Sequence, residues 1–194
     1  MDVRVVPGIQ QFSPPDVMRG EETQIAGFLA NNRNFHGIVC LPGTHCKWVE
    51  IASGEIRSFR STMTGELFSL LATQSVLRHS VAADGWSDMD FGRGISAALE
   101  DPAAVTTHLF SIRAGHLLGQ LNPVSARSYL SGLLIGQEIA VLQSYWQAQP
   151  IVIIGAGKLA DRYRAAFEMT GTSAELIDVA SATLAGLIAT RKYS

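Results

Sequence analysis

Three short strand-like segments, closely linked between residues 38 and 60, restrict the fold of this chain more than any other feature. The segments cover residues 38–41, 46–51 and 55–60, and the turn residues Pro42-Gly43 and Ser53-Gly54 separate them. Strands joined by such short connections pair in antiparallel fashion, because a parallel crossover needs about a dozen residues or more. The pattern therefore predicts a three-strand antiparallel meander.

Two strand-and-helix units follow toward the C-terminus. Residues 151–154 form the continuous apolar run expected of a strand buried on both faces, and residues 155–157, Gly-Ala-Gly, turn it into a helix over 158–170. A strand over 176–179 and a helix over 180–190 come next. Further helices are predicted over 20–31, from Thr64 onward, and over 93–100, 103–117 and 125–148, with a strand over 3–8 and loops over 13–16 and 84–94. This order predicts an α/β fold with a mixed sheet.

The composition favours a folded core over disorder, since 47% of the 194 residues are hydrophobic and only 16% are charged. The formal net charge is −2 and no basic block occurs, so a nucleic-acid partner is not expected. No apolar stretch matches a membrane span, and the polar N-terminal residues do not resemble a signal peptide. These observations predict a cytoplasmic protein without a membrane partner, in which Cys40 and Cys46 are reduced, packed side chains.

The string "IVIIGAGKLADRY" carries the geometry of an anion or nucleotide site. A buried strand leads through two glycines into a helix, whose first N–H groups are open to a ligand. A dinucleotide fingerprint would need a further glycine where Ala160 stands, and Asp178 would have to supply its acidic residue. The alternatives are therefore a nucleotide-binding turn, a plain strand-to-helix turn and, more remotely, an NAD site.

The string "LPGTHCKW" places glycine, a hydroxyl and a lysine at the tip of the first hairpin. Gly43 and Thr44 can donate backbone and hydroxyl hydrogen bonds to phosphate oxygens. Lys47 can add positive charge, although strand alternation leaves its direction open. The spacing is not that of a P-loop and no helix follows, so a simple hairpin is the alternative.

Two further strings complete the candidate set. In "MRGEETQIAG", Glu21 or Glu22 can accept the proton of a substrate hydroxyl, and Arg19 can bind a carboxylate or phosphate. The alternative is that both glutamates only complement the dipole of their helix. In "SATLAGLIA", small residues at helical spacing predict close packing against another helix and no chemistry.

Together the four strings resemble the actin-like, ribonuclease H-like fold of sugar kinases, with helices on both faces of a mixed sheet. More narrowly, "VMRGEETQ", "LPGTHCKWV", "FRSTMTGELFSLL" and "YLSGLLIGQEIA" resemble the 2-dehydro-3-deoxygalactonokinase family, over almost the whole chain. The resemblance implies an enzyme that uses ATP to phosphorylate the 6-hydroxyl of 2-keto-3-deoxygalactonate, in galactonate catabolism.

The resemblance also implies roles for particular residues. Glu22, with Glu21 as the runner-up, would be the catalytic base, and Arg19 would bind the substrate carboxylate. The nucleotide-binding residues would be Gly43, Thr44, His45 and Lys47 around the terminal phosphates, and Gly155, Ala156, Gly157 and Lys158 around the adenosine and first phosphate. Magnesium would arrive with ATP, held through phosphates and water, and no metal site made of protein ligands is expected.

Members of this family carry a further lobe, sized like a small domain of roughly a hundred residues. We therefore expect residues 1–15 to be the end of that first lobe and residues 16–194 to be the second domain. ATP would then bind between the two lobes, and a face left bare would favour a homodimer. The alternative function is a non-catalytic nucleotide- or partner-binding domain derived from such a kinase.

Overall fold

A computed structural model describes residues 5–191 of the chain. Contacts divide the chain into two compact units. Unit 1 is assembled from Met1–Thr62, Ala148–Arg164 and Ser173–Ser194, and unit 2 from Met63–Gln147 and Ala165–Thr172. The second unit is therefore inserted into the sequence of the first.

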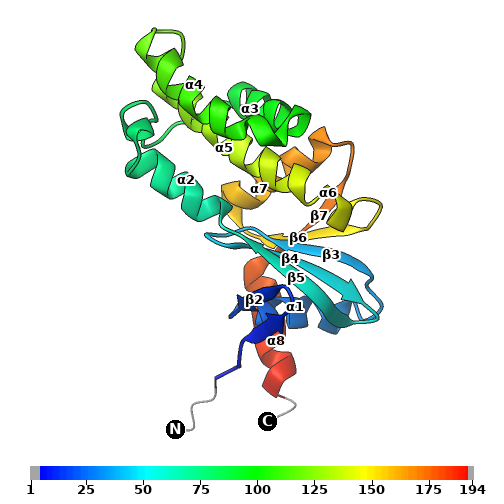
Figure 1. The fold of residues 1–194 in the computed structure, drawn as a ribbon. Coiled ribbons are helices and arrows are strands. Elements are labelled where there is room, and N and C mark those ends of the chain that lie inside the picture. The colour runs from blue at the N-terminus through cyan, green and yellow to red at the C-terminus, as the bar shows by residue number, and fades with distance from the viewer. Residues whose placement is uncertain (1–4, 192–194) are drawn as a thin grey trace. The chain divides into compact units, whose positions relative to one another are not determined.

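A mixed five-stranded sheet forms the centre of unit 1 (Figure 1). Its strands are β3 (Gly37–Leu41), β4 (Cys46–Ala52), β5 (Glu55–Thr62), β6 (Ile151–Gly155) and β7 (Ala174–Asp178), in the order β5-β4-β3-β6-β7. β3, β4 and β5 pair in antiparallel fashion, whereas β6 is parallel to both β3 and β7. The predicted meander and mixed sheet are confirmed, and β3 and β6 are buried along their whole length as their unbroken apolar runs indicate.

Helices cover both faces of this sheet within unit 1. On one face, α1 (Glu21–Asn31) and α8 (Val179–Arg191) pack against alternate strand residues. That cluster includes Ile25, Phe28, Ala182, Val39, Leu41, Val49, Val152 and Ile154. On the other face lies the first part of α7 (Gly157–Met169), because the hydroxyl of its Tyr163 lies 2.9 Å from the Sγ of Cys46. The expected α/β architecture is therefore present.

α1 and α8 cross at very short range through facing glycines. A Cβ atom added at Gly27 would overlap the carbonyl oxygen of Ala182, and one at Gly186 would overlap the carbonyl oxygen of Thr23. Only a hydrogen fits at either position, so the backbones of the two helices touch. The small residues of "SATLAGLIA" serve this contact, as the sequence predicts.

The N-terminal segment differs from expectation. The described residues of the predicted strand over 3–8, Val5 to Gly8, form no strand, and residues 3 and 4 lie outside the described part. A two-stranded hairpin follows instead, β1 (Ile9–Phe12) and β2 (Pro15–Met18), so the loop predicted over 13–16 is wrong at its second half. The side chain of Gln11 makes two hydrogen bonds to the backbone of Phe59, at 3.0 and 3.2 Å, and holds the hairpin on β5. Because side chains, and not a strand ladder, join this hairpin to β5, the hydrophobic pattern of the sequence did not indicate it.

Unit 2 is helical. Its elements are α2 (Thr64–Thr73), a 3₁₀ turn (Val76–His79), α3 (Asp88–Glu100), a 3₁₀ turn (Pro102–Ala104), α4 (Val105–Leu117), α5 (Pro123–Val141), α6 (Gln143–Trp146) and the end of α7. α3 begins at Asp88, inside the predicted loop over 84–94, and α5 ends at Val141, before the predicted end at 148. No helix within residues 5–191 is both long and apolar enough to cross a bilayer.

α3 and α5 also cross on facing glycines, since a Cβ at Gly94 would overlap the Tyr129 carbonyl and one at Gly132 would overlap the Phe91 carbonyl.

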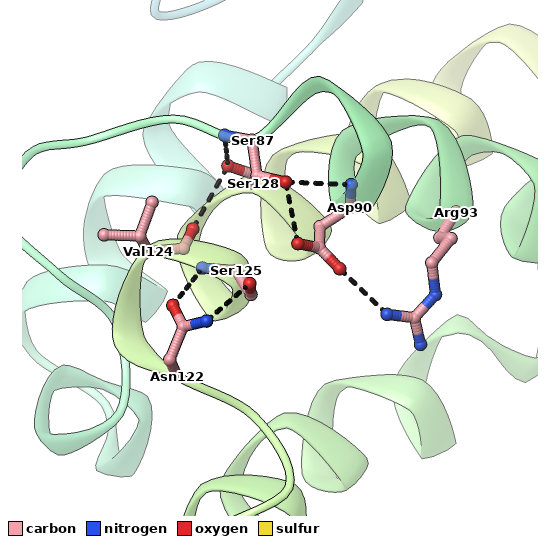
Figure 2. Close-up of polar contacts among 7 residues, drawn as sticks. All are labelled: Ser87, Asp90, Arg93, Asn122, Val124, Ser125 and Ser128. Atoms are coloured by element: carbon pink, nitrogen blue, oxygen red, sulfur yellow. Dashed lines mark hydrogen bonds and ion pairs between the residues drawn. The ribbon is translucent and has the colours of Figure 1, made fainter.

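A polar network at the start of α3 explains why the helix begins where it does (Figure 2). The Ser87 hydroxyl accepts a hydrogen bond from the backbone N–H of Asp90 and donates to its carboxylate, at 3.3 and 2.8 Å. This is helix capping, which a hydrophobic-pattern analysis of a polar, glycine-bearing stretch overlooks.

Candidate functional site

A cavity of about 420 Å³ opens in unit 1 at the edge of the sheet where its parallel strands end. β3 ends there at Leu41, β6 at Gly155 and β7 at Asp178. In open α/β sheets, ligands bind beyond the carboxyl ends of the strands, because loops and helix N-termini gather there. The lining comprises Arg19, Gly20, Glu21, Gln24, Leu41, Pro42, Gly43, Thr44, His45, Ile154, Gly155, Ala156 and Val179.

The hairpin tip and the glycine turn meet in this cavity. A Cβ on Gly155 would lie 2.9 Å from the Cβ of Ala160 and 3.8 Å from the Cδ of Pro42, so Gly155 lets the turn pack beneath the hairpin. Gly157 has a φ of 59°, which only glycine adopts without strain. Two strings more than a hundred residues apart, one at Gly43 and one at Gly155, therefore form one concave wall.

The base of the hairpin is anchored from below by a cysteine. The Sγ of Cys46 lies 2.9 Å from the hydroxyl of Tyr163 and donates to the carbonyl of Gly43 at 3.5 Å. Both Cys40 and Cys46 are buried, as their expected packing role requires. The sequence alone did not indicate the role of Tyr163, because an aromatic residue in a helix usually signals only packing.

The start of α1 supplies the acidic and basic groups. Gly20 precedes the helix with a φ of 106° and no side chain caps this end. The carboxylate of Glu21 accepts a hydrogen bond from the backbone N–H of Arg19 at 3.1 Å, and that of Glu22 accepts from the N–H of Gly20 at 2.6 Å. Glu21 is half-buried and lines the cavity, whereas Glu22 is only 9% exposed and lies outside the lining.

The structure thus brings together most of the predicted residues. Those in the cavity lining are Arg19, Glu21, Gly43, Thr44, His45, Gly155 and Ala156. Gly157 and Lys158 stand just beyond it, exposed in the first turn of α7. Two predicted residues, Glu22 and Lys47, are buried and do not line this cavity.

Lys47 instead lines a second cavity of about 540 Å³. Strand alternation puts Lys47 on the opposite side of β4 from Cys46. Its ammonium group donates to the hydroxyl of Ser61 at 2.7 Å. Ser61 and its partner Asp16 are residues that sequence reasoning missed, since neither belongs to a recognisable motif. The walls of this second cavity are Gly8, Ile9, Gln10, Val17, Met18, Arg19, Glu21, His45 and Lys47.

Electrostatics at the strand ends favour an anion. α7 and α8 both begin at this edge, and a helix N-terminus presents unpaired N–H groups and positive potential. At α8 the carboxylate of Asp178 accepts from the backbone N–H and hydroxyl of Ser181, both at 2.8 Å, and these bonds hold the pKa of Asp178 below its ordinary value. Asp178 is therefore engaged in capping. Within the described residues, no group of three or more His, Cys, Asp or Glu side chains is placed to hold a metal ion.

The solved structures that resemble this chain include two that bear on its class. A crystal structure of a protein assigned as a 2-dehydro-3-deoxygalactonokinase from Sinorhizobium meliloti matches with a TM-score of 0.91 and 40% identity, over 96% of this chain and 64% of that one. Component A of (R)-2-hydroxyglutaryl-CoA dehydratase from Acidaminococcus fermentans matches with a TM-score of 0.54 over 87% of this chain and 64% of that one. Its 14% identity makes the second a likeness of fold alone. The class that the fold and these likenesses define is a mixed α/β protein built on a five-stranded sheet.

Sequence relatives narrow the class to a family. The 2-keto-3-deoxy-galactonokinase family matches residues 1–190. A probable 2-dehydro-3-deoxygalactonokinase of Rhizobium meliloti is 42% identical, over 97% of this chain and 63% of the relative. The 2-dehydro-3-deoxygalactonokinase of Escherichia coli K12 is 36% identical, over 96% and 64%. The chain belongs to the 2-keto-3-deoxy-galactonokinase family and spans somewhat less than two thirds of the length of these relatives.

Proposed function

We propose that the protein takes part in the ATP-dependent phosphorylation of the terminal hydroxyl of 2-keto-3-deoxygalactonate, a sugar acid. One observation carries the proposal: in a member of this kinase family, the hairpin tip, the glycine turn and the start of α1 line one cavity at the strand ends. Phosphoryl transfer consists mostly of positioning and charge neutralisation, and this cavity offers backbone donors, a guanidinium group and a carboxylate together.

The nucleotide would lie along the wall made by the hairpin and the glycine turn. Backbone N–H groups of Gly43 and Thr44, with the Thr44 hydroxyl and His45, would bind the terminal phosphates. Gly155 and Ala156 would approach the adenosine and first phosphate, and Gly157 and Lys158 would flank them. Magnesium, arriving with ATP, would be held mainly by phosphate oxygens and water and would neutralise charge on the transferred group.

Glu21 would accept the proton of the attacking hydroxyl. Of the two adjacent glutamates, Glu21 lines the cavity, whereas the carboxylate of Glu22 is buried against the N–H of Gly20. Glu22 would then position the turn before α1. Arg19, which lines both cavities, would contact the acceptor sugar acid.

The rest of the active enzyme would come from the region of the relatives that this chain does not match. We propose that residues 16–194 correspond to the second domain of the kinase and residues 1–15 to the end of the first, with ATP bound between the two domains in the cytoplasm. A second candidate function is nucleotide binding without transfer, since the hairpin tip and the glycine turn that line the cavity could hold a nucleotide by themselves. Two copies would pair as a homodimer, and the same assay tests this because the activity of a dimer depends on protein concentration.

The test is ADP release by the protein with magnesium-ATP and 2-keto-3-deoxygalactonate, compared with galactose as a neutral sugar. We expect release that depends on the sugar acid. Glu21→Gln should lower kcat by about a hundredfold or more, as loss of a general base does, with ATP affinity unchanged. Glu22→Gln, the matched variant, should affect stability more than kcat.

Two outcomes overturn parts of the proposal. If ATP binds but no ADP is released with any sugar acid, the kinase function fails for this chain and the binding function stands. If Glu22→Gln loses turnover while Glu21→Gln retains it, the assignment of the base is reversed.

A further inference from the structure

The second cavity of unit 1 is built around a buried lysine. Lys47 is only 6% exposed, yet it is one of the residues that line a cavity of about 540 Å³. A buried ammonium group is costly unless it is paired and hydrogen-bonded. The proposed phosphate wall does not explain this lysine, because Lys47 does not line the cavity at the strand ends.

A directed chain of hydrogen bonds holds the lysine in place. The Ser61 hydroxyl donates its single hydrogen to the carboxylate of Asp16 at 2.6 Å, so its lone pairs are left to accept from Lys47 at 2.7 Å. A second oxygen of Asp16 accepts from the backbone N–H of Ser61, also at 2.6 Å. Asp16 thus fixes Ser61, and Ser61 fixes the ammonium group. An ammonium group has three donors, so the bond to Ser61 does not exhaust its capacity.

The lining of this cavity suits a small organic anion. Lys47 and Arg19 bring two positive charges, whereas the carboxylate of Glu21 brings one negative charge and already accepts from the backbone of Arg19. Ile9, Val17 and Met18 supply apolar surface for a carbon chain. Charge-assisted bonds to a carboxylate are stronger than bonds between neutral groups, so an acid would be preferred to its neutral analogue.

The two cavities share part of their lining. Arg19, Glu21 and His45 line both, whereas Lys47 lines only the second and Gly155 only the first. A molecule whose carboxylate meets Lys47 would therefore direct its other end toward the shared residues. That end would lie beside Glu21, next to the phosphate wall.

We infer that this second cavity binds the carboxylate end of the acceptor, with Lys47 as its ionic partner and with Ser61 and Asp16 as positioning residues. The inference deepens the proposed function, on which it rests for the identity of the acid. It moves Lys47 from the nucleotide to the acceptor and makes it the residue that distinguishes a sugar acid from a neutral sugar.

The experiment is a calorimetric titration of 2-keto-3-deoxygalactonate and of its C1 amide into the protein. Wild type should bind the acid about tenfold or more tightly than the amide, given the usual strength of bonds between charged groups. In Lys47→Met, which keeps the length of the side chain, the ratio of the affinity for the acid to that for the amide should fall close to one. Arg57→Met, which removes an exposed charge from β5, should keep the wild-type preference.

Ser61→Ala tests the positioning role. Without the hydroxyl the ammonium group is no longer held, and the preference for the acid should fall several-fold while binding of the amide changes little. A ratio of two affinities in one sample is not altered by a loss of folded protein, so a variant that folds poorly still gives a usable result. If Lys47→Met itself cannot be purified, Ser61→Ala and the acid-to-amide ratio of wild type carry the test.

The outcomes separate this inference from the proposed function. Equal acid preference in wild type and Lys47→Met overturns the inference even if the protein is an active kinase. Equal binding of acid and amide by wild type, or no binding of the acid, also overturns it. Magnesium-ATP titrated into the same samples reports on the proposed nucleotide wall by itself, and loss of that binding would be a failure of the proposed function.

Discussion

Helix α1 of unit 1 and helix α3 of unit 2 use the same packing device and begin in opposite ways. Each crosses a partner helix through facing glycines, α1 with α8 and α3 with α5. α3 starts with a closed polar network in which Ser87 caps the helix and Asp90 is 3% exposed. α1 starts at Gly20 without a side-chain cap and borders two cavities.

The difference shows how buried polar groups can serve either the fold or a ligand. The network at α3 is directed inward: Ser87 and Arg93 bond Asp90, and the Ser87 backbone N–H donates to Ser128 at 2.9 Å (Figure 2). A hydrogen bond from Ser125 also helps to lower the pKa of Asp90. At the start of α1, Arg19 and Glu21 instead line both cavities, and Gly20 lines the first. A closed start stabilises a helix, whereas an open start leaves donors and charge available for binding.

The largest expected effect on stability comes from disrupting the helix crossings, which both units build on facing glycines. Gly186→Ala in α8 and Gly132→Ala in α5 both place a methyl group against a backbone carbonyl, so each should lower the free energy of unfolding by about 2 kcal/mol or more. Urea denaturation followed by circular dichroism measures the loss. In Gly92→Ala the new methyl group would meet only the flexible end of Met169, at 3.8 Å, and this control should be neutral or slightly stabilising. Similar losses in all three variants would show that the crossings are not specially tight.

The second prediction concerns the hydrogen-bond network at the N-terminus of α3. Asp90→Asn removes the charge that Ser87, Ser125 and Arg93 bond, and should cost about 2 kcal/mol of stability. The matched control is Asp161→Asn, because Asp161 also pairs with an arginine three residues on, at 3.2 Å, but on an exposed surface. The control should change stability by less than about 0.5 kcal/mol. Equal effects on the urea midpoint would mean that burial of the Asp90 network adds nothing.

Asp90 also predicts a pH dependence. Burial alone would raise the pKa of Asp90, but the hydrogen bonds from Ser125, Ser87 and Arg93, with the charge of Arg93, hold it below the ordinary value of 3.8. A carboxylate with a lowered pKa stabilises the fold above its ordinary pKa, and this contribution is lost as the pH falls through the lowered value. Unfolding of the wild type below about pH 4 should therefore be steeper with pH than unfolding of Asp90→Asn. Parallel pH profiles would contradict this assignment.

The smallest effect should come from the cap itself. Ser87→Ala removes the acceptor for the N–H of Asp90 and should cost about 1 kcal/mol. Ser111→Ala serves as the control, since Ser111 is an exposed serine inside α4 whose hydroxyl only bonds back to the Thr107 carbonyl at 3.2 Å. That change should be neutral or slightly stabilising, because alanine is the better helix former. Thermal unfolding of the two variants side by side distinguishes a cap from a generic serine effect.

Most of the fold was predictable because it follows from hydrophobic period and turn residues. The meander, β6 and the helices after Gly155 and Asp178 all carry such signals. The errors fall where side chains replace backbone pairing or where capping sets a boundary. Gln11 binds the β1–β2 hairpin to β5, and Ser87 starts α3 within a stretch that looks like a loop.

The sequence allowed the chain segments of the candidate site to be predicted, but not which side chains of those segments line the cavity. Motif strings identified the hairpin, the glycine turn and the start of α1, and one cavity joins them. Nothing in the string "GEET" tells which glutamate lines that cavity, because the answer depends on how Gly20 turns into the helix. Likewise the direction of Lys47 depends on Ser61 and Asp16, which are distant in sequence and belong to no motif.

The insertion of one unit into the other has a consequence for how the protein folds during synthesis. Ile38 of β3 pairs with Ile151 of β6, and the stretch Met63–Gln147 lies between them in the chain. Pairing of such distant strands is slow, because the entropy of closing a long loop is lost before the contact forms. The helices of that stretch leave the ribosome before β6 does and can form their local contacts first. The central sheet, and with it the wall between Gly43 and Gly155, is therefore completed late.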